Sequence, residues 1–286
     1  MHWLELSVQV PFEFVEPVSY LFSRYGRGLS VEDVGSGQAL LRTYLTSRSK
    51  VRRARIEVGV KLIGVIKPIK GLEVRVLDKI DWEEAWKEHF SLLKVGRSLV
   101  IKPPWIVHTG TEWEHVIELD PGLAFGTGHH PTTFMCLELL EDLVRSGTRM
   151  LDLGVGSGIL TIAAAKLGAQ AIIALDVDPT AVKVARKSLS HNELDVDVKV
   201  ARGTLPHGLV LENSFDLCVT NISAKVVGDH ATFLGGCLKL GGELIVSGFL
   251  IEQEEHVLNR LTEVGLSFCD RREIEDWVAM VFTKER

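Results

Sequence analysis

The feature that most constrains this sequence is a glycine-rich stretch at residues 151–160, Leu-Asp-Leu-Gly-Val-Gly-Ser-Gly-Ile-Leu. Apolar residues typical of a buried strand precede the three glycines, and residues with helical spacing follow them. Glycines permit a tight turn and a close approach of the backbone to a ligand, and the first turn of a helix offers unpaired N–H groups. The stretch therefore predicts a strand, a turn and a helix that together bind a small molecule.

Helical and apolar strand segments alternate from about residue 133 to the C-terminus. Strands are expected at residues 149–153, 171–175, 197–201, 215–220 and 243–247, followed by two final strands. Near-continuous apolar strands separated by helices are typical of a parallel sheet that is covered on both faces. We therefore expect a doubly wound α/β catalytic domain over residues 111–286.

The first 79 residues follow the different order β-α-β-β-α-β. Strand-like segments fall near residues 4–10, 28–34, 39–45 and 72–77, and helices near 12–24 and 47–66. This order predicts a smaller α+β domain of ferredoxin-like topology, with residues 61–69 also compatible with a strand. Residues 80–110 are expected to link the two domains through an amphipathic helix, because Trp82, Trp86 and Phe90 recur at helical spacing.

Charge is distributed unevenly along the chain. Residues 1–80 contain 13 Lys or Arg against 8 Asp or Glu, whereas residues 81–286 contain 19 against 30. This asymmetry suggests that the two parts contact different partners or different faces of one partner. The basic run at residues 48–55 could contact RNA, but a solvated helix face explains it as well, and we expect no direct binding of nucleic acid.

Two further patterns bear on location and redox state. No apolar run approaches the roughly 18 to 20 residues that span a bilayer, and the first residues do not resemble a signal peptide, so we expect a cytoplasmic protein without a membrane anchor. The four cysteines are far apart and lie in apolar segments. We therefore expect Cys136, Cys218, Cys237 and Cys269 to be buried reduced thiols, and no metal site.

The spacing of the glycines and their acidic neighbours indicates which cofactor is bound. Ile159 stands where a dinucleotide fingerprint would have its third glycine. Asp152 would repel a pyrophosphate, but it suits the ammonium group of the methionine end of S-adenosylmethionine. Asp176 ends the next predicted strand, where a carboxylate can bind ribose hydroxyls. These features favour S-adenosylmethionine over a nicotinamide dinucleotide.

Further candidate positions follow the predicted strands. Gly203 and Thr204 follow the third strand and would lie near the adenine edge, although a plain turn is equally compatible. Asn221 ends the fourth strand, at the edge where open α/β sheets bind ligands, although it could also cap the next helix. Asp178 precedes Pro179 and is expected to be only an N-cap.

Several of these stretches resemble the PrmA family, the bacterial methyltransferases of large-subunit ribosomal protein eleven. The loop at residues 120–133, Asp-Pro-Gly-Leu-Ala-Phe-Gly-Thr-Gly-His-His-Pro-Thr-Thr, resembles the signature loop of that family. Residues 152–160 resemble its cofactor turn, 219–222 its asparagine motif, 82–86 its interdomain tryptophan helix and 275–279 its closing strand. The resemblance covers residues 80–286 well and the N-terminal domain by pattern only.

The resemblance implies a class I methyltransferase, Rossmann-like, with a mostly parallel seven-stranded sheet. It implies methylation of lysine side chains and of the N-terminal α-amine of the ribosomal protein. The ferredoxin-like domain of this chain would bind that substrate. It also implies that Thr133, Gly154, Asp176 and Asn221 contact S-adenosylmethionine under a closing loop. The predicted cofactor-binding set is Phe125, Gly126, Thr127, Thr133, Asp152, Gly154, Gly156, Gly158, Asp176 and Asn221, with Asn221 also catalytic.

His129 and Lys225 depart from the family pattern and concern the acceptor site more than the cofactor site. His130 is a further candidate for anchoring the loop or for the acceptor site. Because a carboxylate touching an amine would raise the pKa of that amine, the neutral amide of Asn221 is the better group to orient the acceptor. We expect the protein to act as a monomer.

Three other functions remain open. The main alternative is a class I methyltransferase that acts on another protein lysine or on a small molecule, because the cofactor motifs are shared. A nicotinamide-dependent reductase is disfavoured by Asp152 and by the missing third fingerprint glycine. A binding module without catalysis is disfavoured because Asp152, Asp176 and Asn221 are all present.

Overall fold

The computed structural model describes residues 3–77, 92–120 and 128–285. The chain forms two compact units. The first comprises Met1–Leu93, Lys102–Thr109 and Leu119–His130, and the second comprises Lys94–Ile101, Gly110–Glu118 and Pro131–Arg286. The predicted boundaries at residues 79 and 110 stay predictions, and the expected tryptophan helix at residues 82–90 lies outside the described residues.

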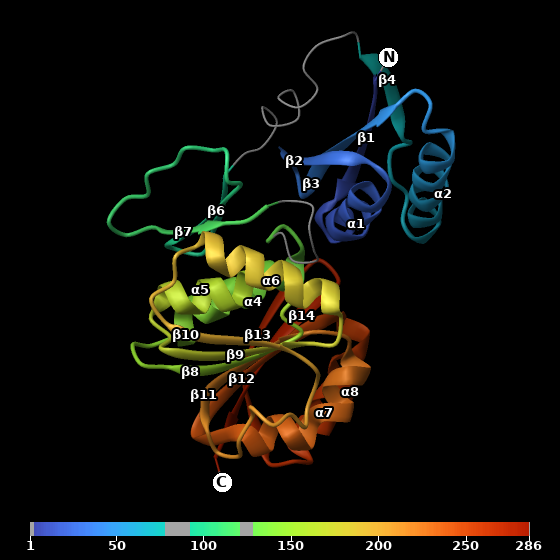
Figure 1. The fold of residues 1–286 in the computed structure, drawn as a ribbon. Coiled ribbons are helices and arrows are strands. Elements are labelled where there is room, and N and C mark those ends of the chain that lie inside the picture. The colour runs from blue at the N-terminus through green and yellow to red at the C-terminus, as the bar shows by residue number, and fades with distance from the viewer. Residues whose placement is uncertain (1–2, 78–91, 121–127, 286) are drawn as a thin grey trace. The chain divides into compact units, whose positions relative to one another are not determined.

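The first unit contains the predicted β-α-β-β-α-β order. Its elements are β1 (Trp3–Pro11), a 3-10 turn (Phe12–Phe14), α1 (Val15–Tyr25), β2 (Arg27–Gly35), β3 (Gln38–Thr46), α2 (Lys50–Ile66) and β4 (Glu73–Leu77). The strand order is β2-β3-β1-β4, and all neighbouring pairs are antiparallel. The ferredoxin-like topology is therefore confirmed (Figure 1). The alternative strand at residues 61–69 is wrong, because α2 continues to Ile66.

The core of this unit lies between the sheet and its two helices. Inward and outward residues alternate along β1, as expected for a sheet with one covered face. Leu6, Phe22, Leu41 and Ile56 are fully buried there. In contrast, α2 buries only Ile56 and Val60 along its length, so most of its surface, basic residues included, faces solvent.

The second unit is built on a seven-stranded sheet of order β10-β9-β8-β11-β12-β14-β13. Its strands are β8 (Arg149–Leu153), β9 (Ala171–Asp176), β10 (Asp197–Arg202), β11 (Phe215–Asn221), β12 (Leu238–Leu250), β13 (Leu266–Ile274) and β14 (Trp277–Lys284). The strands from β10 to β12 are parallel, whereas β14 pairs antiparallel with both β12 and β13. The predicted doubly wound, mostly parallel sheet is confirmed.

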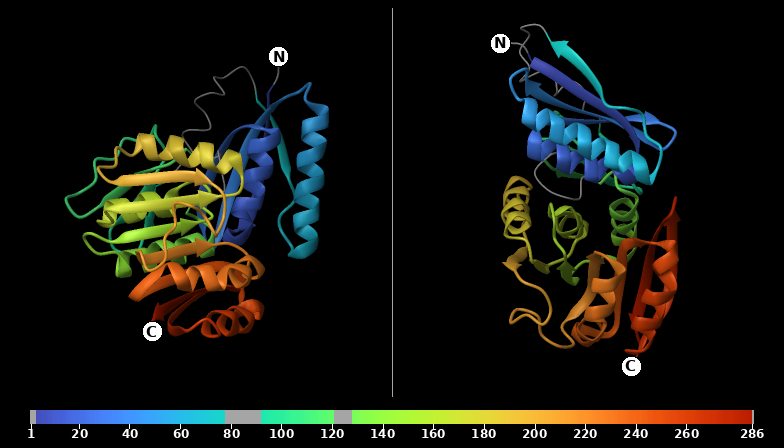
Figure 2. Two further views of the ribbon diagram at one scale, coloured as in Figure 1. Left: turned by 60° about the horizontal axis from the view of Figure 1, so that its bottom comes forward. Right: turned by 90° about the vertical axis from the view of Figure 1, so that its right-hand side faces the viewer.

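Helices cover both faces of this sheet, as Figure 2 shows. On one face lie α4 (Pro131–Leu143), α5 (Ile159–Leu167) and α6 (Pro179–His191), and on the other α7 (Ala224–Cys237) and α8 (Glu254–Thr262). The two faces of the sheet are therefore both apolar, with Leu151, Leu244 and Phe282 fully buried. Asp178 caps α6 by accepting the Thr180 N–H at 2.7 Å, as predicted.

A small three-stranded sheet of order β5-β6-β7 was only partly predicted. It consists of β5 (Leu93–Val95), β6 (Leu99–Lys102) and β7 (His115–Glu118). Strand β6 ends at Lys102, because Pro103 and Pro104 follow and proline cannot donate to a ladder. Among the described residues, no helix is long and apolar enough to cross a membrane.

The expectation of four buried thiols is wrong for one of them. Cys136, Cys218 and Cys237 are buried, but Cys269 is exposed. Cys269 lies on β13, which pairs with β14 alone and forms an edge of the sheet. Most of β13 is solvent-exposed for that reason, and an apolar sequence context did not reveal the edge position.

Strand β12 is irregular where it passes the end of β11. Its register against β14 shifts between Val246 and Phe249. Gly248, inside this shift, has a φ of +96°, and a Cβ there would lie 2.6 Å from the backbone N of Ile222. The Ile222 N–H donates to the Ser247 carbonyl at 3.0 Å. This close approach fixes where β11 ends and where Asn221 is held.

We expect Gly248→Ala to destabilise the fold more than Gly241→Ala. Both glycines have positive φ, which costs an L-residue about 1–2 kcal/mol, but a Cβ at Gly241 meets nothing within 4 Å. Gly248→Ala adds the overlap with Ile222, for a total of roughly 2–5 kcal/mol. Urea unfolding of the two variants measures the difference. Equal losses of unfolding free energy would show that the close approach to Ile222 is not a constraint.

Candidate active site

The predicted site residues follow strands whose carboxyl ends meet at one edge of the large sheet. Strands β8, β9, β10 and β11 are parallel. The chain runs from β8 to β9 and β10 on one side of the sheet and from β11 to β12 on the other, so the strand order reverses between the neighbours β8 and β11. Open α/β sheets bind ligands at such a point, beyond the carboxyl ends of the strands. Gly154 follows β8, Asp176 ends β9 and Asn221 ends β11. The fold therefore brings these three residues to the place where a ligand is expected.

The glycine turn between β8 and α5 adopts a backbone that other residues rarely take. Gly154, Gly156 and Gly158 have φ values of +91°, +52° and +87°. The N–H of Gly154 donates to the Leu175 carbonyl of β9 at 2.8 Å. A Cβ on Gly154 would lie 2.6 Å from the side chain of Ile222. The turn thus needs glycine both for its conformation and for its closeness to the end of β11.

Asp176 connects the end of β9 to this turn. One carboxylate oxygen accepts the Gly156 N–H at 3.0 Å, and the other accepts the Asp178 N–H at 2.9 Å. Each carboxylate oxygen has a second lone pair and can accept a further hydrogen bond. Asp176 is half-buried, so it can hold the turn and still accept hydrogen bonds from a ligand's hydroxyl groups.

Asp152 lies beneath the turn and is completely buried. Its Oδ2 accepts the Thr161 hydroxyl of α5 at 2.6 Å, and its Oδ1 has no hydrogen-bond partner among the described residues. Burial raises the pKa of Asp152 to about 7, against the opposing effect of the Thr161 hydrogen bond. The structure thus ties Asp152 to α5, and its contact with a ligand ammonium group stays a prediction.

Asn221 is held from a different element. Its amide Nδ2 donates to the hydroxyl of Thr133 at 3.2 Å. Thr133 is buried in the first turn of α4, so its hydroxyl is a fixed partner. This bond directs the NH₂ group toward α4 and leaves the amide oxygen Oδ1 to accept from a ligand. Two residues that the sequence predicted separately are therefore hydrogen-bonded to each other.

The signature loop is only partly described. Phe125, Gly126 and Thr127 lie outside the described residues. His130 is buried in the first unit, and burial lowers its pKa to about 4 despite a hydrogen bond with the backbone of Glu13, so it is neutral at pH 7. The ring of His129 packs edge-on against Phe12, with centroids 6.4 Å apart. Within residues 3–77, 92–120 and 128–285, no cluster of acidic, His or Cys side chains could hold a metal.

Two contributing residues were not predicted from the sequence. Thr161 holds Asp152, and His230 on α7 lies with its Nε2 2.7 Å from the Thr204 hydroxyl. Neither residue belongs to a motif, so only the packing of α5 and α7 against the strand ends reveals them. Lys225, one of the family departures, is exposed on α7 and forms an ion pair with Asp229.

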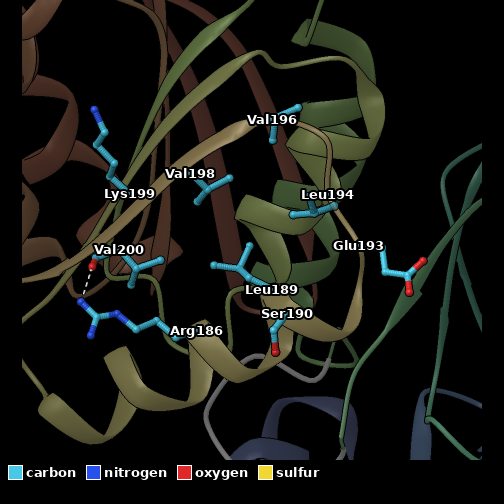
Figure 3. A pocket seen from close by; sticks show the side chains of 9 residues that line it. All are labelled: Arg186, Leu189, Ser190, Glu193, Leu194, Val196, Val198, Lys199 and Val200. Atoms are coloured by element: carbon cyan, nitrogen blue, oxygen red, sulfur yellow. Dashed lines mark hydrogen bonds between the residues drawn. The ribbon is translucent and has the colours of Figure 1, made fainter.

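A pocket of about 650 Å³ lies elsewhere, between the second half of α6 and strand β10 (Figure 3). Its lining includes Leu189, Leu194 and Val198, and Arg186 bridges it by donating to the Val200 carbonyl at 2.7 Å. None of the predicted site residues that the structure describes lines it. It is a groove along the edge strand, distinct from the site at the carboxyl ends.

Comparisons with known proteins agree on one family. Residues 2–285 match the family described as ribosomal protein L11 methyltransferase (PrmA). The ribosomal protein L11 methyltransferase of Herpetosiphon aurantiacus is 38% identical over 319 aligned positions, covering 99% of both chains. That of Chloroflexus aurantiacus is 39% identical, covering 98% of this chain and 97% of its own. The crystal structure of a ribosomal protein L11 methylase from Lactobacillus delbrueckii subsp. bulgaricus is similar, with a TM-score of 0.64, 28% identity and coverage of 69% of this chain and 100% of that one.

We expect Asp152→Asn to gain stability relative to the native protein as the pH rises from about 4 to 7. The pKa of Asp152 in the folded state, about 7, lies above the unfolded value near 3.9. The native state therefore binds more protons in this window, and the stability associated with protonated Asp152 is lost as the pH rises through it, by up to about 4 kcal/mol. Urea unfolding at pH 4.5 and pH 8 measures the change.

Thr161→Val serves as the matched variant for this experiment. It removes the hydroxyl that favours the ionised carboxylate, so it should destabilise the protein more at pH 8 than at pH 4.5. A stability difference between Asp152→Asn and the native protein that is constant across this range would contradict the assignment.

Proposed function

The chain belongs to the ribosomal protein L11 methyltransferase family, and from this premise we propose that it transfers methyl groups from S-adenosylmethionine to amines of ribosomal protein L11. One observation supports this proposal above the others. The glycine turn, Asp176 and Asn221 follow three strands whose carboxyl ends meet at the edge where this sheet type binds ligands. The family match and the geometry of the site thus point to the same reaction.

The residues of the site have the chemistry that S-adenosylmethionine requires. The Asp176 carboxylate can accept from both ribose hydroxyls while it stays bonded to Gly156 and Asp178. Gly154 and Gly156 give the ligand access to backbone that a side chain would cover. The Oδ1 of Asp152, which has no hydrogen-bond partner in the described part of the chain, is an acceptor of the kind that a ligand ammonium group satisfies. We propose that Phe125, Gly126 and Thr127 close over this site.

The bound cofactor supplies a methyl group on a positively charged sulfur, which is already a good leaving group, so the protein mainly positions the acceptor. A lysine with a pKa near 10.4 must first lose its proton, which costs roughly 4–5 kcal/mol at pH 7. A site that excludes water lowers this cost by favouring the neutral amine. A nearby carboxylate would have the opposite effect.

Asn221 meets these requirements as a neutral acceptor. The Thr133 hydroxyl accepts a hydrogen bond from the NH₂ group of Asn221, so the Asn221 Oδ1 can accept one N–H of the substrate amine. A hydrogen bond from the amine to this oxygen fixes the direction of the nitrogen lone pair. We assign Asn221 as the residue that aims the lone pair at the methyl group, with Thr133 holding its amide.

The acceptors that we propose are lysine side chains and the N-terminal α-amine of ribosomal protein L11. We assign substrate binding to the ferredoxin-like domain, whose basic charge contrasts with that of the acidic catalytic domain. We further propose that the enzyme works in the cytoplasm, where ribosomal proteins are made. It would act there as a monomer, because the glycine turn, Asp176, Thr133 and Asn221 all come from one chain. We also propose that it does not bind nucleic acid directly.

The alternative function is methylation of another protein lysine or of a small molecule. Mass spectrometry of purified ribosomal protein L11, incubated with this enzyme and S-adenosylmethionine, distinguishes the two. We expect added masses of about 14 Da per methyl group, mapped to lysines or to the N-terminal amine. An unmodified ribosomal protein, with S-adenosylmethionine still bound by the enzyme, would leave the cofactor assignment intact and exclude this substrate.

We expect Asn221→Asp to reduce kcat by on the order of 100-fold, with a change of less than about fivefold in the Kd of S-adenosylhomocysteine. A charged carboxylate would favour the protonated amine, which has no lone pair to attack the methyl group. Steady-state kinetics and calorimetry measure the two effects separately. Unchanged turnover would remove Asn221 from the acceptor site.

Thr133→Val tests the partner of Asn221 in the same assays. It retains the shape of the side chain but removes the hydroxyl that accepts from Nδ2. We expect turnover to fall on the order of tenfold, because the amide can then rotate. Thr133→Ser, which keeps the hydroxyl, should restore most of the activity.

A further inference from the structure

We propose that Thr204 and His230 form an adenine-reading pair, in which the Thr204 oxygen accepts the exocyclic amino group of the cofactor's base. This inference rests on the proposed function, because it concerns the same cofactor. It adds two residues, of which His230 comes from α7 and belongs to no recognised motif. The pair would determine which base the enzyme accepts.

The hydrogen bonds around His230 indicate which atom of the pair donates and which atom accepts. The Nδ1 of His230 lies 3.0 Å from the Val226 carbonyl, which can only accept, so a ring with one hydrogen carries that hydrogen on Nδ1. The other nitrogen, Nε2, is then an acceptor, and it lies 2.7 Å from the Thr204 hydroxyl. Thr204 therefore donates to His230. Its oxygen is left with lone pairs only and can bind a donor but not another acceptor.

The position of Thr204 matches the base end of the proposed ligand. The Gly203 N–H donates to the Asp176 carbonyl at 2.9 Å, so the loop after β10 lies against the residue that we assign to the ribose. Strands β8, β9 and β10 are consecutive neighbours in the sheet, as Figure 1 shows. A ligand that starts at the glycine turn after β8 and places its ribose at Asp176 extends its base toward the loop after β10. Thr204, half-buried, is in that loop.

Adenine and hypoxanthine differ in the hydrogen-bonding group that each would present to the Thr204 oxygen. Adenine carries an amino group that donates, whereas hypoxanthine carries a carbonyl oxygen that accepts at the same position. An oxygen that can only accept forms a hydrogen bond with the amino group of adenine and repels the carbonyl oxygen of hypoxanthine. Two facing acceptors leave both groups unsatisfied, so we expect discrimination of roughly 10- to 100-fold in favour of adenine.

His230 is necessary for this discrimination, because a threonine hydroxyl alone can rotate and either donate or accept. Without His230, Thr204 would be able to donate to the carbonyl of hypoxanthine. We therefore expect His230 to affect which base is bound, although His230 itself does not contact the ligand. Loss of His230 should improve binding of the hypoxanthine analogue, while binding of the adenine compound changes little.

The test measures the Kd values of S-adenosylhomocysteine and S-inosylhomocysteine by calorimetry. For the native protein we expect the first to bind roughly 10- to 100-fold more tightly. In Thr204→Val and His230→Phe this ratio should fall to within about threefold, and His230→Phe should bind S-inosylhomocysteine more tightly than the native protein does. Thr204→Ser keeps the hydroxyl and should keep the ratio. His191→Phe, at an exposed histidine in the last turn of α6, is the control and should change neither value.

An unchanged ratio in Thr204→Val or His230→Phe overturns the proposal while leaving the proposed function in place. If the native protein binds neither compound, the proposed cofactor and this inference both fail. Circular dichroism checks that each variant is folded. If His230→Phe does not fold, the ratio measured with the nearly isosteric Thr204→Val decides the question alone.

Discussion

The site depends on one backbone constraint, the left-handed glycine turn that is hydrogen-bonded to the end of β9. Asp176 accepts the Gly156 N–H, and the Leu175 carbonyl accepts the Gly154 N–H, so two neighbouring strands end in a single bonded unit. Closeness to Ile222 then places the end of β11 against the same turn. The ligand-binding edge is therefore held together by a main-chain bond to Leu175 and by a bond to the side-chain carboxylate of Asp176.

The sequence predicted the architecture well because both domains follow strong periodic patterns. Apolar strands alternating with helices predicted the doubly wound sheet, and the β-α-β-β-α-β order predicted the antiparallel domain. The turn, Asp176 and Asn221 could be placed because a strand end is a fixed position in this type of sheet. The predicted roles of these residues rest on the shared edge and on the family, and only ligand-bound measurements test them.

Properties that depend on tertiary packing could not be predicted from the sequence. Cys269, which stands between Phe268 and Asp270, was expected to be buried, yet it is exposed because β13 is an edge strand. Asp152 stands next to the glycine turn in sequence, but its side chain is buried against Thr161. The partners Thr133 for Asn221 and His230 for Thr204 come from helices distant in sequence. No local pattern indicates which helix will lie over which strand end.

The order of the last strands has a consequence for how the protein is made. Strand β14 follows β12 and β13 in the chain but lies between them in the sheet. During synthesis, β12 and β13 emerge from the ribosome before β14, the strand with which both of them pair in the folded protein. The edge of β12 that does not pair with β11 stays unpaired until Met280 and Phe282 of β14, both fully buried, have left the ribosome. The catalytic sheet therefore cannot be completed before β14 has emerged, whereas the four strands of the ferredoxin-like domain all lie within residues 3–77 and emerge early.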